Sequence, residues 1–175
     1  MTEFVISDPH FYHRKIIRLC QRRPEGRRDL FYDEFEMNDY IITKWNSVVK
    51  PNDSVRLLGD VALCKNFSEL KSIMKLLNGH IHVITGNHDH YSSLVRARLD
   101  NCNLSSVTDG IMLWDNRFLL SHVPVSNPKY VNLHGHLHDA NSPTAMHINV
   151  CVEKWDYTPV AMEMIEKVVK ERKLC

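Results

Sequence analysis

Three short apolar runs in the first half of the chain each end in a loop of glycine, proline and polar residues. The runs cover residues 4–7, 55–58 and 81–85, and their length and composition predict buried strands. Segments with apolar residues at helical spacing separate them, at residues 16–20, 33–48 and 68–77. Strands that alternate with helices form parallel sheets, which bind ligands at the carboxyl ends of their strands. The pattern therefore predicts an α/β arrangement with a functional site in these loops.

Local signals set the bounds of two expected helices. Asp33 followed by Glu36 is typical of a capping box, and we expect a helix from there to about Val48. A second helix is expected over residues 68–77, stopped by Gly79. Both segments carry apolar residues on one face, which predicts that they pack against the sheet.

The second half of the chain has a different pattern. Short strands are expected at residues 111–114 and 117–120, joined by a hairpin turn at Asp115-Asn116. Further strands are expected at 131–133 and 147–152. Thr158-Pro159 indicates the start of the last helix, with proline in its first position. No linker or internal repeat divides the chain, so a single domain over residues 1–175 is expected.

Composition excludes several classes of protein. Hydrophobic content of 43% and charged content of 25% are ordinary for a globular protein, and a net charge of +1 gives no global attraction to nucleic acid or membrane. We expect a cytoplasmic protein without a membrane partner, since no signal peptide or long apolar stretch is evident. The cysteines form no CxxC pair and indicate reduced thiols. They are Cys20, Cys64, Cys102, Cys151 and Cys175.

Residues with metal-binding side chains occupy the loops that follow the expected strands. In chain order they are Asp8, His10, Asp60, Asn87, His122, His136 and His138, with His88 and Asp89 beside Asn87. Carboxylate, imidazole and amide oxygen are all ligands for divalent cations. The positive charge of two divalent cations exceeds the negative charge of the Asp8 and Asp60 carboxylates. Such a site would therefore attract a phosphate anion. This inventory indicates a two-metal hydrolytic site.

Each of these residues taken alone has a more ordinary interpretation. A lone aspartate such as Asp8 at the end of a strand is more often a helix cap or a solvated turn. A lone His122 is more often a half-buried histidine with its hydrogen bonds satisfied. His136 and His138 are two residues apart, so on a strand they would share one face. Taken alone, such a pair is a metal site about as often as it is not. The ordered combination therefore carries the prediction.

The motifs Asp8-x-His10, Gly59-Asp60, Gly86-Asn87-His88-Asp89, His122 and Gly135-His136-x-His138, in this order, resemble the calcineurin-like metallophosphoesterase superfamily. The short chain is similar to its small, uncapped bacterial and phage members. The resemblance implies a single-domain, two-sheet β-sandwich flanked by helices, of the α/β (α+β) class.

The resemblance also implies which residues hold the two divalent metal ions. Asp8, His10, Asp60 and His138 would hold one ion. Asp60, Asn87, His122 and His136 would hold the other, so that Asp60 bridges them. Manganese is the first candidate from the family, with iron, zinc or nickel as alternatives.

The implied activity is that of a metal-dependent phosphoric ester hydrolase, with phosphodiesterase favoured over phosphatase. A metal-bound hydroxide would attack a nucleotide-type phosphodiester, and His88 would protonate the leaving oxygen or steady the phosphate. Asp89 would accept the other ring proton of His88 and fix its tautomer. The alternatives are a phosphomonoesterase or phosphoprotein phosphatase, a nuclease, and a metal-holding binding scaffold with little turnover. A structural single-zinc site is disfavoured, because such sites prefer closed sets rich in cysteine.

The segment from Arg14 to Arg28 is locally basic, with seven cations and Glu25 as the one anion. It is either a solvated surface or an anion-binding patch for a nucleotide or nucleic-acid end. The solvated interpretation is favoured, because no aromatic residues are interleaved with the cations. His13 and Arg14 are nevertheless candidates for contacting substrate. Cys151 and Arg56 depart from the family pattern and are expected not to touch the ligand set.

Overall fold

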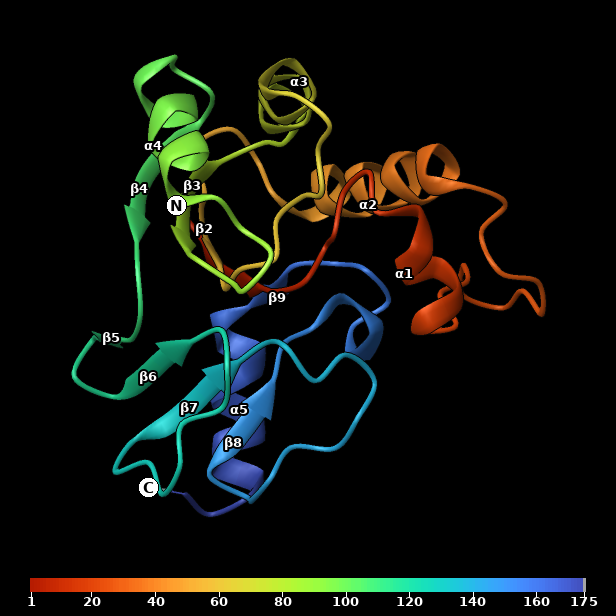
Figure 1. Ribbon diagram of the computed structural model, residues 1–175. Coiled ribbons are helices and arrows are strands. Elements are labelled where there is room, and N and C mark those ends of the chain that lie inside the picture. The colour runs from red at the N-terminus through yellow and green to blue at the C-terminus, as the bar shows by residue number, and fades with distance from the viewer. Residues whose placement is uncertain (175) are drawn as a thin grey trace.

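The three apolar runs of the first half lie together in a five-stranded sheet, which two later segments complete, in the order β4-β3-β2-β1-β9 (Figure 1). The computed structural model describes residues 1–174. The strands are β1 (Glu3–Ile6), β2 (Ser54–Leu57), β3 (His80–Ile84), β4 (Leu104–Thr108) and β9 (Val160–Ala161). Strands β1 to β4 are parallel and β9 is antiparallel to β1. The predicted parallel sheet is confirmed.

The second half forms a four-stranded sheet in the order β5-β6-β7-β8. Its strands are β5 (Met112–Trp114), β6 (Phe118–Ser121), β7 (Val131–His134) and β8 (His147–Asn149). Strands β5 and β6 are antiparallel, which confirms the predicted hairpin, and the other pairs are parallel. Asp115 and Asn116 at its turn have φ of 51° and 52°. Such short polar residues tolerate this left-handed conformation.

Helices flank the two sheets. They are α1 (Arg14–Leu19), α2 (Glu34–Val48), α3 (Phe67–Leu76), α4 (Tyr91–Leu99) and α5 (Met162–Glu171), with a short 3₁₀ turn η1 (Val152–Lys154). Side chains alternate along β1, so Phe4 and Ile6 join the core under α1 to α4. Val5 points the other way, into a core shared with the second sheet and α5. The chain therefore forms a two-sheet sandwich with helices outside, as predicted.

Several element bounds differ from the sequence expectations. The last helix begins at Met162 rather than at Thr158-Pro159, because Val160 and Ala161 first pair with β1 as an edge strand. Helix α3 runs from Phe67 to Leu76, one residue earlier at each end than the expected 68–77. Strand β8 ends at Asn149, and Val152 belongs to η1. In contrast, Asp33 caps α2 as predicted by accepting from the backbone N–H groups of its first turn.

No helix within residues 1–174 combines the length and the apolar character that crossing a membrane requires. Cys20, Cys64, Cys102 and Cys151 form no disulfide with one another. Cys175 lies outside the described residues.

Candidate metal centre

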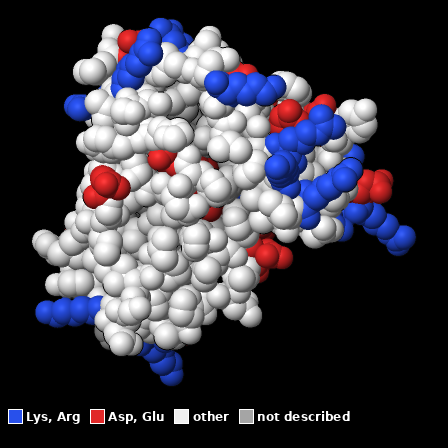
Figure 2. Space-filling model, in the orientation of Figure 1, with Lys and Arg blue, Asp and Glu red and all other residues white. Residues whose placement is uncertain are grey.

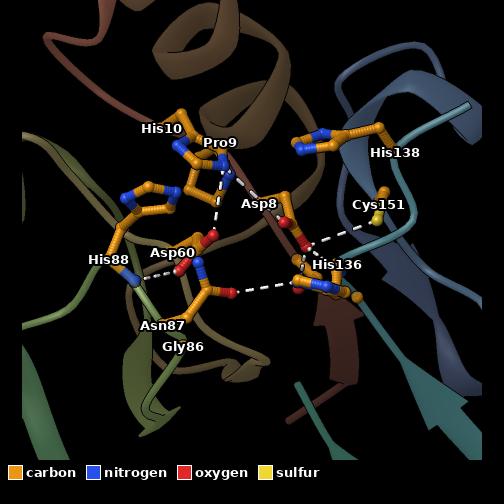
Figure 3. A network of polar contacts seen from close by, with 12 residues as sticks. Asp8, Pro9, His10, Asp60, Gly86, Asn87, His88, His136, His138 and Cys151 are labelled. Carbon is orange, nitrogen blue, oxygen red and sulfur yellow. Dashed lines mark hydrogen bonds and ion pairs between the residues drawn. The ribbon is translucent and has the colours of Figure 1, made fainter. Parts of the chain in front are cut away.

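The predicted ligands meet where loops from both sheets converge (Figure 3). Strands β1, β2 and β3 are parallel, so the loops after them leave from the same edge of the first sheet. The parallel strands β6 and β7 bring their following loops to the same place from the second sheet. The first three loops carry Asp8, His10, Asp60, Asn87 and His88, and the other two carry His122, His136 and His138.

Asp8, His10 and His138 form one group whose ligand atoms lie close enough to share a cation. His10 Nε2 lies 3.7 Å from Asp8 Oδ1, and the rings of His10 and His138 are 5.3 Å apart. Asp8 Oδ1 and His10 Nε2 are buried and have no hydrogen-bond partner among the described residues. A buried polar atom without a partner costs roughly 1–3 kcal/mol. A cation between these two atoms would satisfy both, so the residues fit a metal.

A second group contains Asp60, Asn87, His122 and His136. His122 Nε2 lies 2.8 Å from Asn87 Oδ1 and 3.5 Å from Asp60 Oδ2. His136 Nδ1 lies 2.9 Å from the same Asn87 oxygen. Two imidazole rings thus converge on one amide oxygen, which favours a shared cation there.

Asp60 lies between the two groups. Its Oδ2 is 3.3 Å from His10 Nε2 in the first group and 3.5 Å from His122 Nε2 in the second. Only 2% of the Asp60 residue surface is exposed, so the carboxylate has few solvent contacts. This position suits a carboxylate that two cations share.

Both buried aspartates favour the ionised form. Burial opposes ionisation of Asp8, but the adjacent His10 ring and the charge of His122 outweigh burial and lower its pKa. The pKa of Asp60 is lowered in the same way by His10 and His122. The centre therefore presents two carboxylates to any cation.

Asp89 holds two of the loops together. Its carboxylate accepts hydrogen bonds from the backbone N–H groups of Asp60 at 2.8 Å, Val61 at 2.9 Å and Gly86 at 2.9 Å. This differs from the expectation that Asp89 accepts a ring proton from His88. Both carboxylate oxygens of Asp89 thus accept from backbone amides and join the loop after β2 to the loop after β3.

His88 is exposed, and its ring lies at one side of the centre, next to His10 and Asp60 (Figure 3). Its backbone N–H donates to Asp60 Oδ1 at 2.9 Å, and its ring is 5.4 Å from that of His10. Like His136, His88 is absent from the groups of three His, Cys, Asp or Glu side chains within residues 1–174 whose ligand atoms lie within 4.8 Å of one another. The ring is thus beside the candidate ligands and open to solvent.

Glycines allow the loops to approach the aspartates closely. A Cβ atom at Gly135 would overlap Ser7 Oγ and Asp8 Oδ2. A Cβ atom at Gly86 would overlap the side chain and backbone nitrogen of Asp60. At both positions the loop can reach its aspartate only without a side chain.

A buried arginine supports the first group and was not predicted to do so. Arg22 is only 1% exposed. Its guanidinium donates to the carbonyl oxygens of Asp8 at 2.6 Å and Pro9 at 2.8 Å. It also pairs with Glu153, whose Oε1 lies 3.0 Å from His138 Nδ1. Sequence reasoning placed Arg22 in a surface segment and overlooked Glu153, because partners so distant along the chain leave no local signal.

Cys151 also contacts the ligand set. Its Sγ lies 3.3 Å from Asp8 Oδ2, so the expectation that Cys151 stays clear of the ligands is wrong. Burial and the charge of Asp8 raise the pKa of the thiol, which therefore stays protonated and donates to the carboxylate. Arg56 lies away from the centre, 3.7 Å from Glu3 at the start of β1.

The two residues named as possible substrate contacts differ in position. His13 is buried against the centre, with Nδ1 3.0 Å from His10 Nδ1, and burial lowers its pKa to about 4. Its imidazole is therefore neutral near pH 7. Arg14 begins α1, is exposed, and lies 3.8 Å from Glu34.

No family model matches this chain. The uncharacterized protein MJ1445 of Methanocaldococcus jannaschii is 34% identical over an alignment of 184 positions, which covers 98% of this chain and 93% of that protein. The crystal structure of AQ665 from Aquifex aeolicus, a protein of unknown function, superimposes with a TM-score of 0.70. It is 27% identical and the match covers 95% of this chain and 98% of that one. The nuclease MPE of Pseudomonas putida matches 78% of this chain and 61% of its own, at 16% identity and a TM-score of 0.48, which is too distant to bear on function.

Proposed function

The chain belongs to the family of the uncharacterized protein MJ1445, and we propose that it is a dinuclear metal-dependent phosphoesterase of the calcineurin-like type. Phosphodiesters of the nucleotide type are the favoured substrates. The observation that carries the proposal is the position of Asp60 between two groups of metal-binding side chains. The unpartnered Asp8 Oδ1 and His10 Nε2 support it, since a cation would satisfy both.

Each group of residues would hold one divalent cation. Asp8, His10, Asp60 and His138 would hold the first, and Asp60, Asn87, His122 and His136 the second. Bound cations would supply Lewis acidity and lower the pKa of a water so that it acts as a nucleophile near neutral pH. The mixed imidazole and carboxylate set suits manganese, and also iron, zinc or nickel.

The chain's own residues would position the substrate and handle one proton. His88 has an exposed ring beside the centre, so it would reach the oxygen of the leaving group and donate a proton to it. The hydrogen bond from its backbone N–H to Asp60 keeps that ring next to the candidate ligands. Asp89 would keep the loops that carry Asp60 and Asn87 in register.

An exposed site favours diesters over monoesters. Asn87, His88 and His136 are all exposed, so the centre opens to solvent on that side. A phosphodiester carries groups on both sides of its phosphorus and needs this open approach.

Hydrolysis of two activated esters tests the proposal. Chelated protein would be reloaded with manganese, with zinc or with nothing, and assayed on bis-p-nitrophenyl phosphate and on p-nitrophenyl phosphate. Cleavage of the diester that requires metal and is lost in Asp60→Asn is the expected result. Two bound metals without cleavage of either ester would favour a metal-holding scaffold instead.

A further inference from the structure

Exposed aromatic and basic side chains lie together beside the candidate metal centre. Helix α1 presents Lys15 and Arg18 to solvent, and Tyr32 and Phe35 at the start of α2 are 85% and 58% exposed. Figure 2 shows Lys and Arg side chains gathered over α1 and the loop after it. Large aromatic side chains this exposed often mark a binding surface. The neighbouring cations indicate an anionic partner.

A hollow separates α1 from the segment that leads into α2. Its volume is about 400 Å³, and Lys15, Arg18 and Tyr32 are among the residues that line it. The buried side chains of Ile17 and Phe31 give it an apolar part. A hollow with an aromatic wall and a cationic rim suits a flat base attached to a phosphate, because bases stack on aromatic rings while cations hold the backbone.

Three cations line this hollow, and two of them have no ion-pair partner among the described residues. Arg14, the third, lies 3.8 Å from Glu34 of α2, which partly neutralises it. Lys15 and Arg18 form no ion pair with any residue between 1 and 174. Their positive charge is therefore available to a ligand.

The same surface is connected directly to the metal-ligand loop. His13, the residue before α1, contacts His10 through ring nitrogens 3.0 Å apart. The ring of Tyr12 packs edge-on against that of Phe35, with 6.2 Å between centroids. A strand bound on this surface would therefore extend toward the candidate centre.

We propose that Lys15, Arg18, Tyr32 and Phe35, which we call the α1 platform, bind single-stranded nucleic acid whose phosphodiester enters the metal centre. Single strands are the fitting form because their bases are free to stack on exposed rings, whereas duplex bases are already stacked on one another. The inference rests on the proposed phosphoesterase function and names its substrate class.

Binding by metal-free protein tests the platform without cleavage. A fluorescein-labelled single-stranded DNA of about twelve nucleotides and its duplex would be titrated by fluorescence anisotropy over a range of salt concentrations. We expect Lys15→Glu/Arg18→Glu to weaken single-strand binding by at least about tenfold. The slope of log affinity against log salt concentration should fall in magnitude by about 1.4, because each of the two lost cations contributes about 0.7. Tyr32→Ala should weaken binding by roughly tenfold and leave the slope unchanged, because stacking releases no counterions.

The matched control is Lys167→Glu/Lys170→Glu on α5. These lysines are exposed and have the same spacing as Lys15 and Arg18, so the control reverses the same charge on another helix. We expect it to leave single-strand affinity within about twofold. An equal loss in the control would mean that overall charge, and not the platform, drives binding. Duplex bound as tightly as single strand, or adenosine monophosphate competing as well as the oligonucleotide, would also overturn the proposal.

The two proposals fail in different ways. Metal-dependent cleavage of bis-p-nitrophenyl phosphate with no single-strand binding would overturn the platform alone. Single-strand binding that depends on the platform, in a metal-loaded protein that cleaves no ester, would overturn the phosphoesterase proposal alone.

Discussion

Arg22 and Glu153 form a buried ion pair, with Nη2 and Oε1 2.7 Å apart, although the two residues are 131 positions apart in the sequence. The pair joins two supports of the candidate metal centre. Arg22 binds the carbonyl oxygens of Asp8 and Pro9, and Glu153 binds His138. Burial alone would raise the pKa of Glu153, but the charge of Arg22 outweighs it, so the pKa is lowered and the pair stays ionised.

Glu153→Gln should therefore weaken both metal binding and stability. The substitution leaves the Arg22 charge buried without its counterion, which costs about 3–5 kcal/mol. It also weakens the contact that orients His138, and loss of such supporting contacts typically costs about 10–100-fold in metal affinity. Calorimetric titration with manganese and urea unfolding would measure the two effects. Arg23→Gln, at the exposed neighbour of Arg22, is the control and should stay within about 0.5 kcal/mol of the parent. Unchanged manganese affinity in Glu153→Gln would contradict the positioning role.

Gly135→Ala should displace Asp8 and with it a metal ligand. The new Cβ atom would overlap Asp8 Oδ2 and Ser7 Oγ, and both of these side chains are fully buried. Overpacking of this kind typically costs about 1–3 kcal/mol. Metal titration and thermal unfolding of the variant would show weaker binding and a lower midpoint.

Gly110→Ala is the matched control for that substitution. Gly110 has φ of 97° and open space around its Cβ position, so alanine there is strained but meets no neighbour. We expect some loss of stability, on the order of 1 kcal/mol, with metal affinity unchanged. Equal metal affinity in the two variants would show that the contact at Asp8 does not matter.

The sequence predicts those parts of the fold that rest on local pattern. The helix cap at Asp33 and the hairpin at Asp115-Asn116 lie where expected, because short-range hydrogen bonds and turn geometry decide both. Helix α4 has only Leu94 and Ala97 buried, so it lacks the apolar stripe that would have predicted it. Val160 and Ala161 pair with β1 although a helix was expected there, because tertiary pairing overrides a local helix signal.

The sequence likewise predicts only part of the candidate site. The order of the motifs predicted which loops would converge, and the structure brings Asp8, Asp60 and His122 together. The supporting contacts of Arg22 and Cys151 were not predictable, because each reaches a partner far away in the sequence. The aromatic residues of the α1 platform follow the basic segment, so the sequence shows no interleaving and only the fold brings them beside the cations.

Acid should destabilise the protein partly through His82. Its ring is half-buried beside Arg56 and His80 and bonds Ser106 at 2.9 Å, and burial lowers its pKa to about 4 from 6.5. Below pH 6.5 the His82 ring therefore binds a proton in the unfolded chain but stays neutral in the folded chain. This loss of stability grows as pH falls from 6.5 toward 4 and is absent above 6.5. His82→Gln should show a smaller loss than the parent between about pH 7 and about pH 5 in urea unfolding, and an equal loss in the two proteins would contradict the role of His82.

His88→Ala should separate proton donation from metal binding. Because His88 is outside both groups of candidate ligands, the variant should bind manganese as the parent does. Turnover should fall by roughly 10²–10⁴-fold for diesters with poor leaving groups, such as alkyl alcohols, and much less for p-nitrophenolate, which leaves without protonation. His90→Ala makes the same change two residues away, at another exposed histidine, and should leave both turnovers near the parent values. Asp89→Asn should lower the turnover of both ester classes alike, because its carboxylate holds loop amides rather than the His88 ring. An equal loss for both leaving groups in His88→Ala would assign His88 to holding the phosphate instead of protonating the leaving oxygen.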